Sequence, residues 1–366
     1  MANFLVPLRL GIHDLLSRPR LALVMSLLIA VAAGVFATLQ AYRTGLATEF
    51  NYLAPNLLVV QETQSFGEIY GSRLSPQVGE WLSQKGLRLV VPEIHDITGT
   101  STLNAALIRG VDPRQYTLTE SFTMLSGHSL RPGDPARSAM LGTDLAASRN
   151  LHVGGVVALR GRIFNVVGVF QTGTYADNEA WISLEDAQSL LGWGQDVSIY
   201  IIPDEGILHE GDTPLKGVSV ARKGEGARFE VSQWQPVLDL IGIVTFAMGI
   251  ATALALTNIL WRSAWLRRHE LAVLRTTGFP TLALGGYLLA QAAGVTILGL
   301  WMGAGLTWVF TSGVKMAVPG FTLNPRLDAA SALISLGWIG LILVAGSLLP
   351  AWWLSHLNLA QLLHSE

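Results

Sequence analysis

Cysteine is absent from the 366 residues of this chain. Its absence excludes disulfide bonds, thiolate nucleophiles and cysteine-ligated metal sites. It does not identify a compartment, because a disulfide-free domain folds on either side of a membrane. Stability and any chemistry must therefore come from packing, hydrogen bonds and the remaining side chains.

Charge is also scarce. Only 14% of the residues are charged, 50% are hydrophobic, and the mean hydropathy is +0.43, well above the usual range of soluble globular chains. The composition predicts a membrane protein. The net charge is −2 and the pI is about 6.5, so no basic field suggests a nucleic-acid partner.

Several catalytic and nucleotide-binding patterns are missing as well. The sequence contains no G-x-x-x-x-G-K-[ST] loop for ATP, no G-x-S-x-G elbow and no H-x-x-x-H pair. The central histidines are interpreted as surface residues: His95, His128, His152 and His209. We therefore expect a chain that is not an enzyme and binds no cofactor itself. If ATP drives it, another polypeptide binds the ATP and Mg²⁺.

Four apolar stretches are long enough to cross a bilayer, which needs about 20 residues in a helix. They cover residues 21–42, 237–260, 282–310 and 329–354. A cleaved signal peptide is the alternative interpretation of the first stretch. Its apolar run is about twice the usual length of such a segment, roughly 7 to 15 residues, which favours a membrane anchor.

Basic residues near the ends of these stretches predict their orientation. The leader, residues 1–20, holds Arg9, Arg18 and Arg20, and the connection at residues 261–281 holds four arginines, so both are placed in the cytoplasm. Residues 43–236 carry 15 Lys and Arg against 21 Asp and Glu, a difference of −6, which suits the outer side. An outer loop at 311–328 and a cytoplasmic tail at 355–366 complete the arrangement.

Ionisable side chains are almost absent from the four stretches. Only Asp239 occurs, at the outer edge of the second. Ion-coupled transporters usually need buried ionisable groups along their path, so this class is disfavoured, while spans that only anchor the outer domain remain an alternative. Glycines in "GGYLLAQAAG" and "GLWMGAG" would allow close packing against another helix, including one from a second copy.

The region between the first and second stretches has the pattern of an α+β domain. Short β-rich runs begin at Leu57, Leu87, Ala105, Val156, Ser198 and Gly217, and Gly161 is expected at a hairpin tip. Helices are expected in "SLEDAQSLLG", with Ser183 as N-cap and Gly192 as the stop, and in "GTDLAASRN". The predicted fold is thus four transmembrane helices, arranged 1+3, with a large extracytoplasmic α+β domain after the first.

The connection "WRSAWLRRHELAVLRTTGF", Trp261 to Phe279, contains residues that a simple membrane anchor does not need. Tryptophans and arginines suit a simple membrane-interface anchor, but such an anchor does not account for Glu270 and the helical run that Gly278 closes. A single straight helix would have no clean apolar face. We expect the second span to continue into the cytoplasm, bend, and present a short helix to a partner.

This connection resembles the signature R-R-x-E-[IL]-[GA]-[VIL]-L-[RK]-x-x-G of MacB/FtsX-type ABC permeases. The resemblance extends to "LGIHDLLSRPRLALVMSLLIAVAAGV", to "NLLVVQ", "IRGVDP" and "AMLGTDLAASRNLHVGGVVALRGRIFNVVGVFQTGTYADNEAWISLEDAQSLLG", and to "PAWWLSHLNLAQLL". It implies that the connection is a coupling helix seated in an ATPase subunit. The residues assigned to that contact are Arg267, Arg268, Glu270, Leu271, Leu274, Arg275 and Gly278.

The same resemblance implies the functional setting. We expect a multi-pass protein of the bacterial cell membrane with both termini in the cytoplasm, working with two ABC ATPase subunits and a second permease copy or paralogue. A periplasmic adaptor is a further expected partner. Mechanotransmission would serve export or extraction of a lipid, lipoprotein, peptide or drug. The alternative is FtsX-like signalling that regulates an extracytoplasmic cell-wall hydrolase or sensor without transport.

Overall fold

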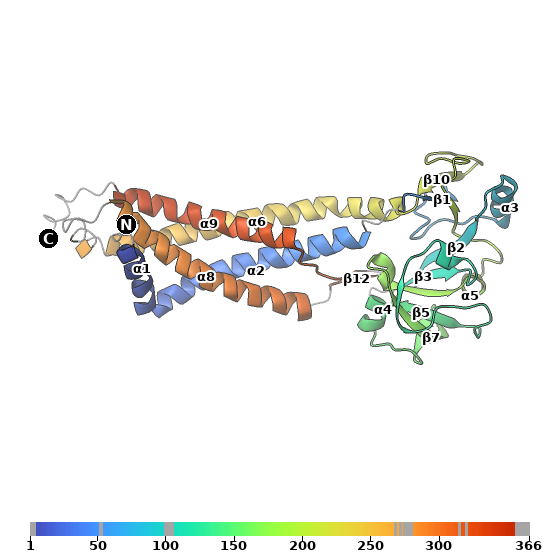
Figure 1. Cartoon of the computed structure of the whole chain (residues 1–366), viewed down its shortest axis with the longest axis horizontal. Helices are drawn as coiled ribbons and strands as arrows, with labels where there is room; N and C mark the ends of the chain where they lie inside the picture. Colours follow the sequence, from blue (N-terminus) through green and yellow to red (C-terminus); the bar gives the residue numbers. More distant parts are fainter. Residues whose placement is uncertain are drawn as a thin grey trace. The chain divides into compact units, whose positions relative to one another are not determined.

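The structure is a computed structural model that describes residues 5–50, 54–98, 106–266, 269–270, 273, 281–313, 316–318 and 321–355. The chain forms two compact units. The membrane unit comprises Met1–Thr44, Pro236–Val314 and Pro325–Glu366, and the outer unit comprises Gly45–Gln235 and Lys315–Asn324. Figure 1 shows their elements along the chain.

Among the described residues, five helices lie wholly or partly in the membrane unit: α1 (Leu5–Ser17), α2 (Pro19–Phe50), α6 (Glu225–Leu266), α8 (Thr281–Gly313) and α9 (Ala329–Ser355). Among the described residues, three segments are long and apolar enough to cross a membrane: Pro19–Phe50, Gln235–Arg262 and Gly286–Ser312. In α9 the described residues Ala332–Ile342 form a shorter apolar helix. The apolar helices are therefore present, and the complete 1+3 arrangement stays a prediction.

The leader helix α1 packs against α8. A Cβ added at Gly11 would lie 2.6 Å from the carbonyl oxygen of Tyr287, so the two backbones approach closely. Asp14 is buried at this contact, where it accepts hydrogen bonds from the hydroxyl of Tyr287 and from Nε2 of Gln291, the latter at 2.9 Å. A carboxylate of the leader thus reaches a spanning helix that has no ionisable group of its own in the span.

Small residues also bring α8 against α2. An added Cβ at Gly299 would lie 2.8 Å from Cβ of Ile29, and one at Gly303 would lie 3.1 Å from the carbonyl oxygen of Ala30. The hydroxyl of Ser26 donates to the carbonyl oxygen of Val295 at 3.1 Å across the same contact. The expected glycine contact is confirmed, and its partner is another helix of this chain.

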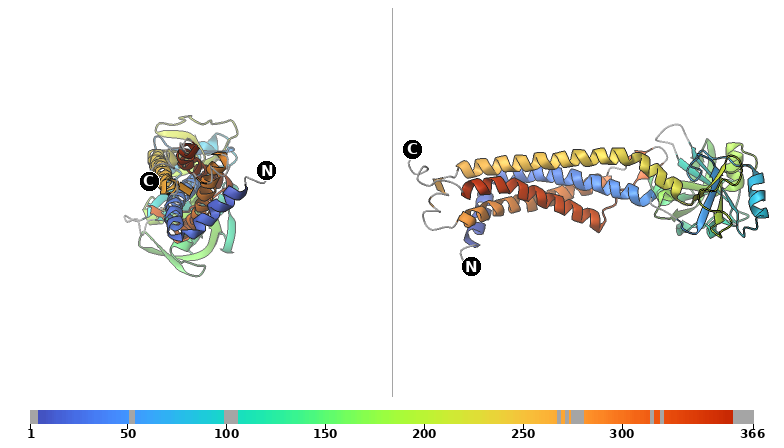
Figure 2. Two further views of the ribbon diagram at one scale, coloured as in Figure 1. Left: turned by 90° about the vertical axis from the view of Figure 1, so that its left-hand side faces the viewer. Right: turned by 90° about the horizontal axis from the view of Figure 1, so that it is seen from above.

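The long helices of the membrane unit lie side by side, and α1 folds back at one end of them (Figure 2). A hydroxyl-to-carbonyl hydrogen bond also joins α6 to α9: the hydroxyl of Thr257 donates to the carbonyl oxygen of Gly346 at 3.1 Å. The described end of α6 and the start of α8 lie at the same end as α1 (Figure 2). The basic leader and the two ends of the charged connection therefore share one end of the bundle.

A mixed ten-stranded sheet forms the outer unit, in the order β10-β1-β9-β2-β3-β8-β5-β7-β4, with β6 paired to β7. The strands are β1 (Leu57–Glu62), β2 (Val91–Thr98), β3 (Ala106–Val111), β4 (Thr123–Gly127), β5 (Ser138–Gly142), β6 (Val156–Leu159), β7 (Arg162–Gln171), β8 (Glu179–Ser183), β9 (Ile199–Pro203) and β10 (Val218–Arg222). The helices are α3 (Pro76–Gln84), α4 (Thr143–Ser148), α5 (Leu184–Leu191) and the 3-10 turns η2 (Tyr116–Leu118) and η3 (Tyr175–Asn178).

The two faces of the sheet bury different cores. Aliphatic side chains, including Ile94, Ile108 and Ile182, form the larger core, which α3 and α5 help to cover. Alternate residues of the same strands face the other way, where Trp181 lies 4.3 Å from Phe170 between ring centroids. The period-2 pattern of the strands separates these two environments.

Most elements expected in this unit are observed. Ser183 caps α5 by accepting a hydrogen bond from the amide of Asp186, and Gly192 ends it with φ of 68°. Leu159 pairs with Arg162 across the hairpin that contains Gly161. The strand expected from Leu87 is wrong, because β2 begins only at Val91 and continues through Pro92.

A short hairpin after α8 belongs to the outer unit. Strands β11 (Met316–Val318) and β12 (Phe321–Leu323) pair antiparallel within the segment expected to be a plain outer loop. The backbone amide of Asn324 donates to Glu49 at 3.3 Å, and its side-chain amide donates to Asp144 in the first turn of α4. The outer unit is therefore built from two separate stretches of the chain.

Candidate functional site

The first candidate site is a cluster of buried charges on the aromatic face of the sheet. Glu93 and His95 alternate along β2, Arg109 pairs with His95 in β3, and Glu179 begins β8. All four side chains are at most 4% exposed. Since strand residues two apart point to the same face, the β2–β3–β8 register brings these groups together beneath the sheet.

Arg109 lies at the centre of this cluster. Its Nε lies 2.8 Å from Glu179, its Nη1 lies 2.7 Å from Glu120, and Glu93 is 3.6 Å away. The guanidinium also lies over the ring of Trp181, 5.1 Å from the centroid. Burial by itself would lower the pKa of Arg109, but Glu179 and Glu120 raise it well above the usual value, so the side chain stays charged.

The cluster extends to the point where α6 begins. Lys223, the residue after β10, donates from Nζ to the carbonyl oxygen of Thr119 at 2.9 Å and to the carboxylate of Glu120. Glu68 accepts from the amide of Gly224 at 2.8 and 2.9 Å and from that of Gly226 at 3.3 Å. A buried carboxylate thus satisfies amides at the start of a 42-residue helix.

An aromatic contact holds the same turn of α6. The rings of Phe66 and Phe229 stack with centroids 4.7 Å apart and an interplanar angle of 18°. Phe66 lies two residues before Glu68, and Phe229 lies one turn into α6. The segment 66–68 therefore contacts the start of the helix through both a carboxylate and an aromatic ring. We call the residues Glu68, Glu120, Lys223 and Phe229 the α6 root.

Burial shifts the protonation of two cluster residues in opposite ways. Desolvation raises the pKa of Glu68 from 4.5 to about 7, although the amides of Gly224 and Gly226 and the charge of Lys223 oppose the shift. Desolvation, together with the charge of Arg109, lowers the pKa of His95 from 6.5 to about 3. His95 is therefore neutral at pH 7. Its Nε2 lies within hydrogen-bond distance of Oε2 of Glu93, at 2.9 Å.

The expectation that His95 lies at the surface is wrong, because this side chain is 4% exposed. The same expectation is confirmed for His128 and His209, whose side chains are 40% and 69% exposed, and His152 is exposed too. A small polar cavity of about 120 Å³ adjoins His95, Glu68 and Arg109. It offers room for a few water molecules rather than for a substrate.

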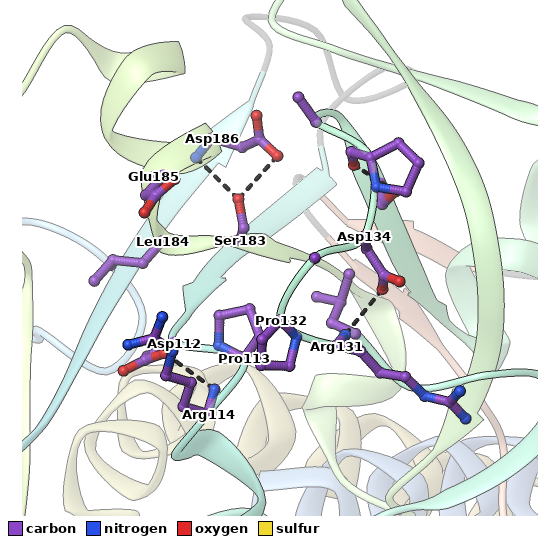
Figure 3. Close-up of a pocket in the computed structure, with 15 residues that line it drawn as sticks. Asp112, Pro113, Arg114, Arg131, Pro132, Asp134, Ser183, Leu184, Glu185 and Asp186 are labelled. Atoms are coloured by element: carbon purple, nitrogen blue, oxygen red, sulfur yellow. Dashed lines mark hydrogen bonds between the residues drawn. The ribbon is translucent and has the colours of Figure 1, made fainter.

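The second candidate site is a surface pocket of about 430 Å³ in the outer unit, shown in Figure 3. Two of its carboxylates, those of Asp186 and Asp134, form hydrogen bonds within local turns of the chain. Asp186 accepts from the hydroxyl of Ser183 at 2.8 Å, and Asp134 accepts from the amide of Arg131 at 2.9 Å (Figure 3). These carboxylates stabilise loops and a helix cap. The contact between the Ser183 hydroxyl and the Asp186 carboxylate belongs to the N-cap of α5, where Ser183 also accepts from the amide of Asp186.

The third candidate site is the charged connection between α6 and α8. Of its seven predicted contact residues, Glu270 is described: it is helical and exposed. The neighbouring His269 and Val273 are helical and exposed too. The predictions for Arg267, Arg268, Leu271, Leu274, Arg275 and Gly278 lie outside the described residues. Across the described part of the chain, no group of three His, Cys, Asp or Glu could hold a metal ion.

Two protein-family models match the sequence of this chain. Residues 21–210 match the MacB-like periplasmic core domain, and residues 242–359 match the FtsX-like permease C-terminal domain. The chain belongs to the MacB/FtsX-type family of ABC transporter permeases. Members of this family are components of ABC transporter complexes, which implies an ATPase partner. No curated protein matches the chain.

The comparison with solved structures gives three matches of low sequence identity, two of which are periplasmic or extracellular domains. The periplasmic region of MacB from Actinobacillus actinomycetemcomitans is 13% identical, with a TM-score of 0.35, over 49% of this chain and 94% of that one. The extracellular domain of the noncanonic ABC-type transporter YknZ from Gram-positive bacteria is 16% identical, with a TM-score of 0.33, over 41% and 84%. A permease domain from Porphyromonas gingivalis is 12% identical, with a TM-score of 0.29, over 46% and 90%.

Proposed function

We propose that this chain is the permease subunit of an ABC transporter that turns ATP hydrolysis by a separate ATPase into movement of its outer domain. The observation that carries the proposal is the continuity of α6. This helix begins at the α6 root, among buried charges of the outer unit, and continues to Leu266, next to the charged connection. A helix that runs from this root to the charged connection, with Pro236 inside it, would carry displacement from one to the other, because packed elements shift as units.

We infer the roles at the charged connection from its resemblance to the family signature. Arg267, Arg268, Glu270 and Arg275 would make charge-assisted hydrogen bonds to the ATPase, and Leu271 and Leu274 would fill its groove. Gly278 would end the helix before α8. The exposure of Glu270 supports this assignment, since a docking residue must be accessible before the partner binds. ATP and Mg²⁺ would be bound by the partner ATPase.

The proposed cargo classes come from the resemblance to the family, and the composition of the spans supports the proposed mechanism. The spans carry almost no ionisable side chains, which supports rigid levers rather than a polar conduit. The proposed cargo is a lipid, lipoprotein, peptide or drug taken up on the outer side of a bacterial cell membrane. Two ATPase subunits require two permease halves, so a second copy or paralogue completes the complex, with a periplasmic adaptor as a further candidate partner.

Co-purification of the ATPase with tagged permease tests the coupling assignment. The double variant Glu270→Ala/Leu274→Ala should lose at least 90% of the bound ATPase, because it removes both a charged and an apolar contact. Glu205→Ala, which removes an exposed carboxylate in an outer-unit loop, serves as the matched control and should retain it. Equal membrane levels of the variants exclude a failure to insert. Unchanged ATPase recovery with the double variant would contradict the assignment.

A further inference from the structure

A groove of about 440 Å³ opens between α2 and α6 in the membrane unit. Apolar side chains of both helices line it, including Leu21 and Val24 from α2 and Ala255 and Ile259 from α6. Such a groove on adjacent spanning helices has the width and polarity to hold a hydrocarbon chain. Its composition alone does not define an occupant.

Two arginines define the chemistry at one end of this groove. Arg18 lies in the turn before α2, where its carbonyl oxygen accepts from the amides of Leu21 and Ala22 at 3.1 Å. Arg262 is the last residue of the apolar segment Gln235–Arg262 of α6. Both side chains are exposed and both line the groove. Because each is found where a spanning segment ends, the two guanidinium groups lie at the level expected for lipid headgroups.

Among the described residues, no carboxylate neutralises these two cations. Within the described part of the chain, neither guanidinium forms an ion pair, and no acidic residue lines the groove. The nearest acidic side chain along the leader, Asp14, already accepts from Tyr287 and Gln291. Two guanidinium groups that share a groove repel one another unless an anion lies between them.

We propose that this groove binds one anionic phospholipid of the bilayer, with the phosphate between Arg18 and Arg262 and an acyl chain along Leu21, Val24 and Ile259. Charge complementarity selects the headgroup, since basic pockets between spanning helices attract anionic lipid. The apolar wall selects a lipid over a free anion. The site depends on α2 and α6 lying in a membrane, and it does not require coupling to an ATPase.

Native mass spectrometry of the full chain in detergent tests the proposal. The protein is mixed with dioleoyl phosphatidylglycerol or dioleoyl phosphatidylcholine, which share their acyl chains and differ in net charge. One phosphatidylglycerol should bind in preference to phosphatidylcholine. Arg18→Gln and Arg262→Gln should each weaken this binding about fivefold, the effect of roughly one headgroup contact per arginine. Ile259→Trp, which fills the apolar wall, should weaken it with both arginines present.

Arg20→Gln is the matched control, because Arg20 is exposed at the same helix end but does not line the groove. It should leave phosphatidylglycerol binding unchanged. The proposal fails if Arg20→Gln weakens binding as much as Arg18→Gln does, or if the two lipids bind equally. It also fails if inorganic phosphate at the same concentration displaces the lipid, because the site would then bind free phosphate.

Discussion

At the scale of single residues, Glu68 stands out because its burial conflicts with its charge. The cluster around it contains four carboxylates, those of Glu68, Glu93, Glu120 and Glu179, against the cations of Arg109 and Lys223. Desolvation of this carboxyl raises its pKa to about 7, so at neutral pH it carries a proton in a large part of the molecules. The contact between the Glu68 carboxyl and the first amides of α6 is therefore sensitive to pH near neutrality.

The sign of this pH dependence follows from linkage. In the folded protein Glu68 keeps its proton up to about pH 7, whereas in the unfolded chain it loses the proton near pH 4.5. The stabilisation is fully present below pH 4.5 and is lost as the pH rises through about 7. His95, with its pKa lowered to about 3, acts in the opposite sense: its contribution is present above pH 6.5 and is lost as the pH falls through 3.

The variant Glu68→Gln isolates the first contribution, because His95 is common to both proteins. Relative to the unchanged protein, the variant should gain roughly 2 kcal/mol in free energy of unfolding between pH 5 and pH 8. Amide hydrogen exchange of β3 and β8 in the full chain measures this difference at each pH. Glu225→Gln, an exposed carboxylate in the first turn of α6, should show a much smaller trend. A pH-independent difference for Glu68→Gln would contradict the account.

Sequence alone does not reveal the charge cluster. Glu93 and His95 have the alternating spacing of one strand face, but that pattern occurs equally at surfaces. Arg109 joins them only through the β2–β3 register, and Glu68 reaches Gly224 across 156 positions of sequence. The one local signal is "RKGEG", a charged segment with two glycines at the point where a long helix begins. The coupling residues, by contrast, were predicted from a contiguous motif.

At the scale of secondary structure, glycines determine how closely the membrane helices approach. Gly299 faces Ile29, whereas Gly305, two turns away on the same helix, has no atom within 4 Å of an added Cβ. The sequence shows both glycines alike, because a small-residue pattern predicts close packing without naming the partner. Only the three-dimensional arrangement separates the glycine that packs from the one that does not.

Gly299→Val therefore tests the α2–α8 contact, with Gly305→Val as its control. The added side chain at position 299 would overlap Ile29 and should cost about 1–3 kcal/mol of stability. The control should lie within about 0.5 kcal/mol of the unchanged protein. Thermal unfolding of the full chain in detergent, followed by loss of the monodisperse species, measures both. Equal stability of the two variants would show that the contact does not contribute.

The elements of the outer unit show which patterns can be read from sequence. Helix α5 was predicted with its cap and its stop, because Ser183 and Gly192 act within a few residues. The hairpin of β6 and β7 was predicted for the same reason. Strand β2 was misplaced because Pro92 interrupts its pattern, and β11 and β12 were missed because strands of three residues carry too little periodicity.

At the scale of the whole molecule, the family places the chain in an ABC transporter complex, and α6 is the helix to which we assign the transmission of force. The sequence contains no Walker A loop, and membership of the family implies an ATPase partner. The start of α6 follows β10 at one edge of the ten-stranded sheet, and Lys223 of the α6 root contacts Glu120, which pairs with Arg109 of β3 near the middle of the sheet. We propose that nucleotide binding by the ATPase changes the local structure of the α6 root, and that α6 transmits this change.

Hydrogen–deuterium exchange of the assembled complex, with and without a non-hydrolysable ATP analogue, tests this claim most directly. The account predicts that nucleotide changes the exchange of amides at residues 218–235 of the outer unit, and that a flexible Gly-Gly-Ser insertion before Pro236 abolishes this change while leaving the ATPase bound. Unaltered exchange at residues 218–235 when nucleotide binds, or a response that survives the insertion, would contradict it.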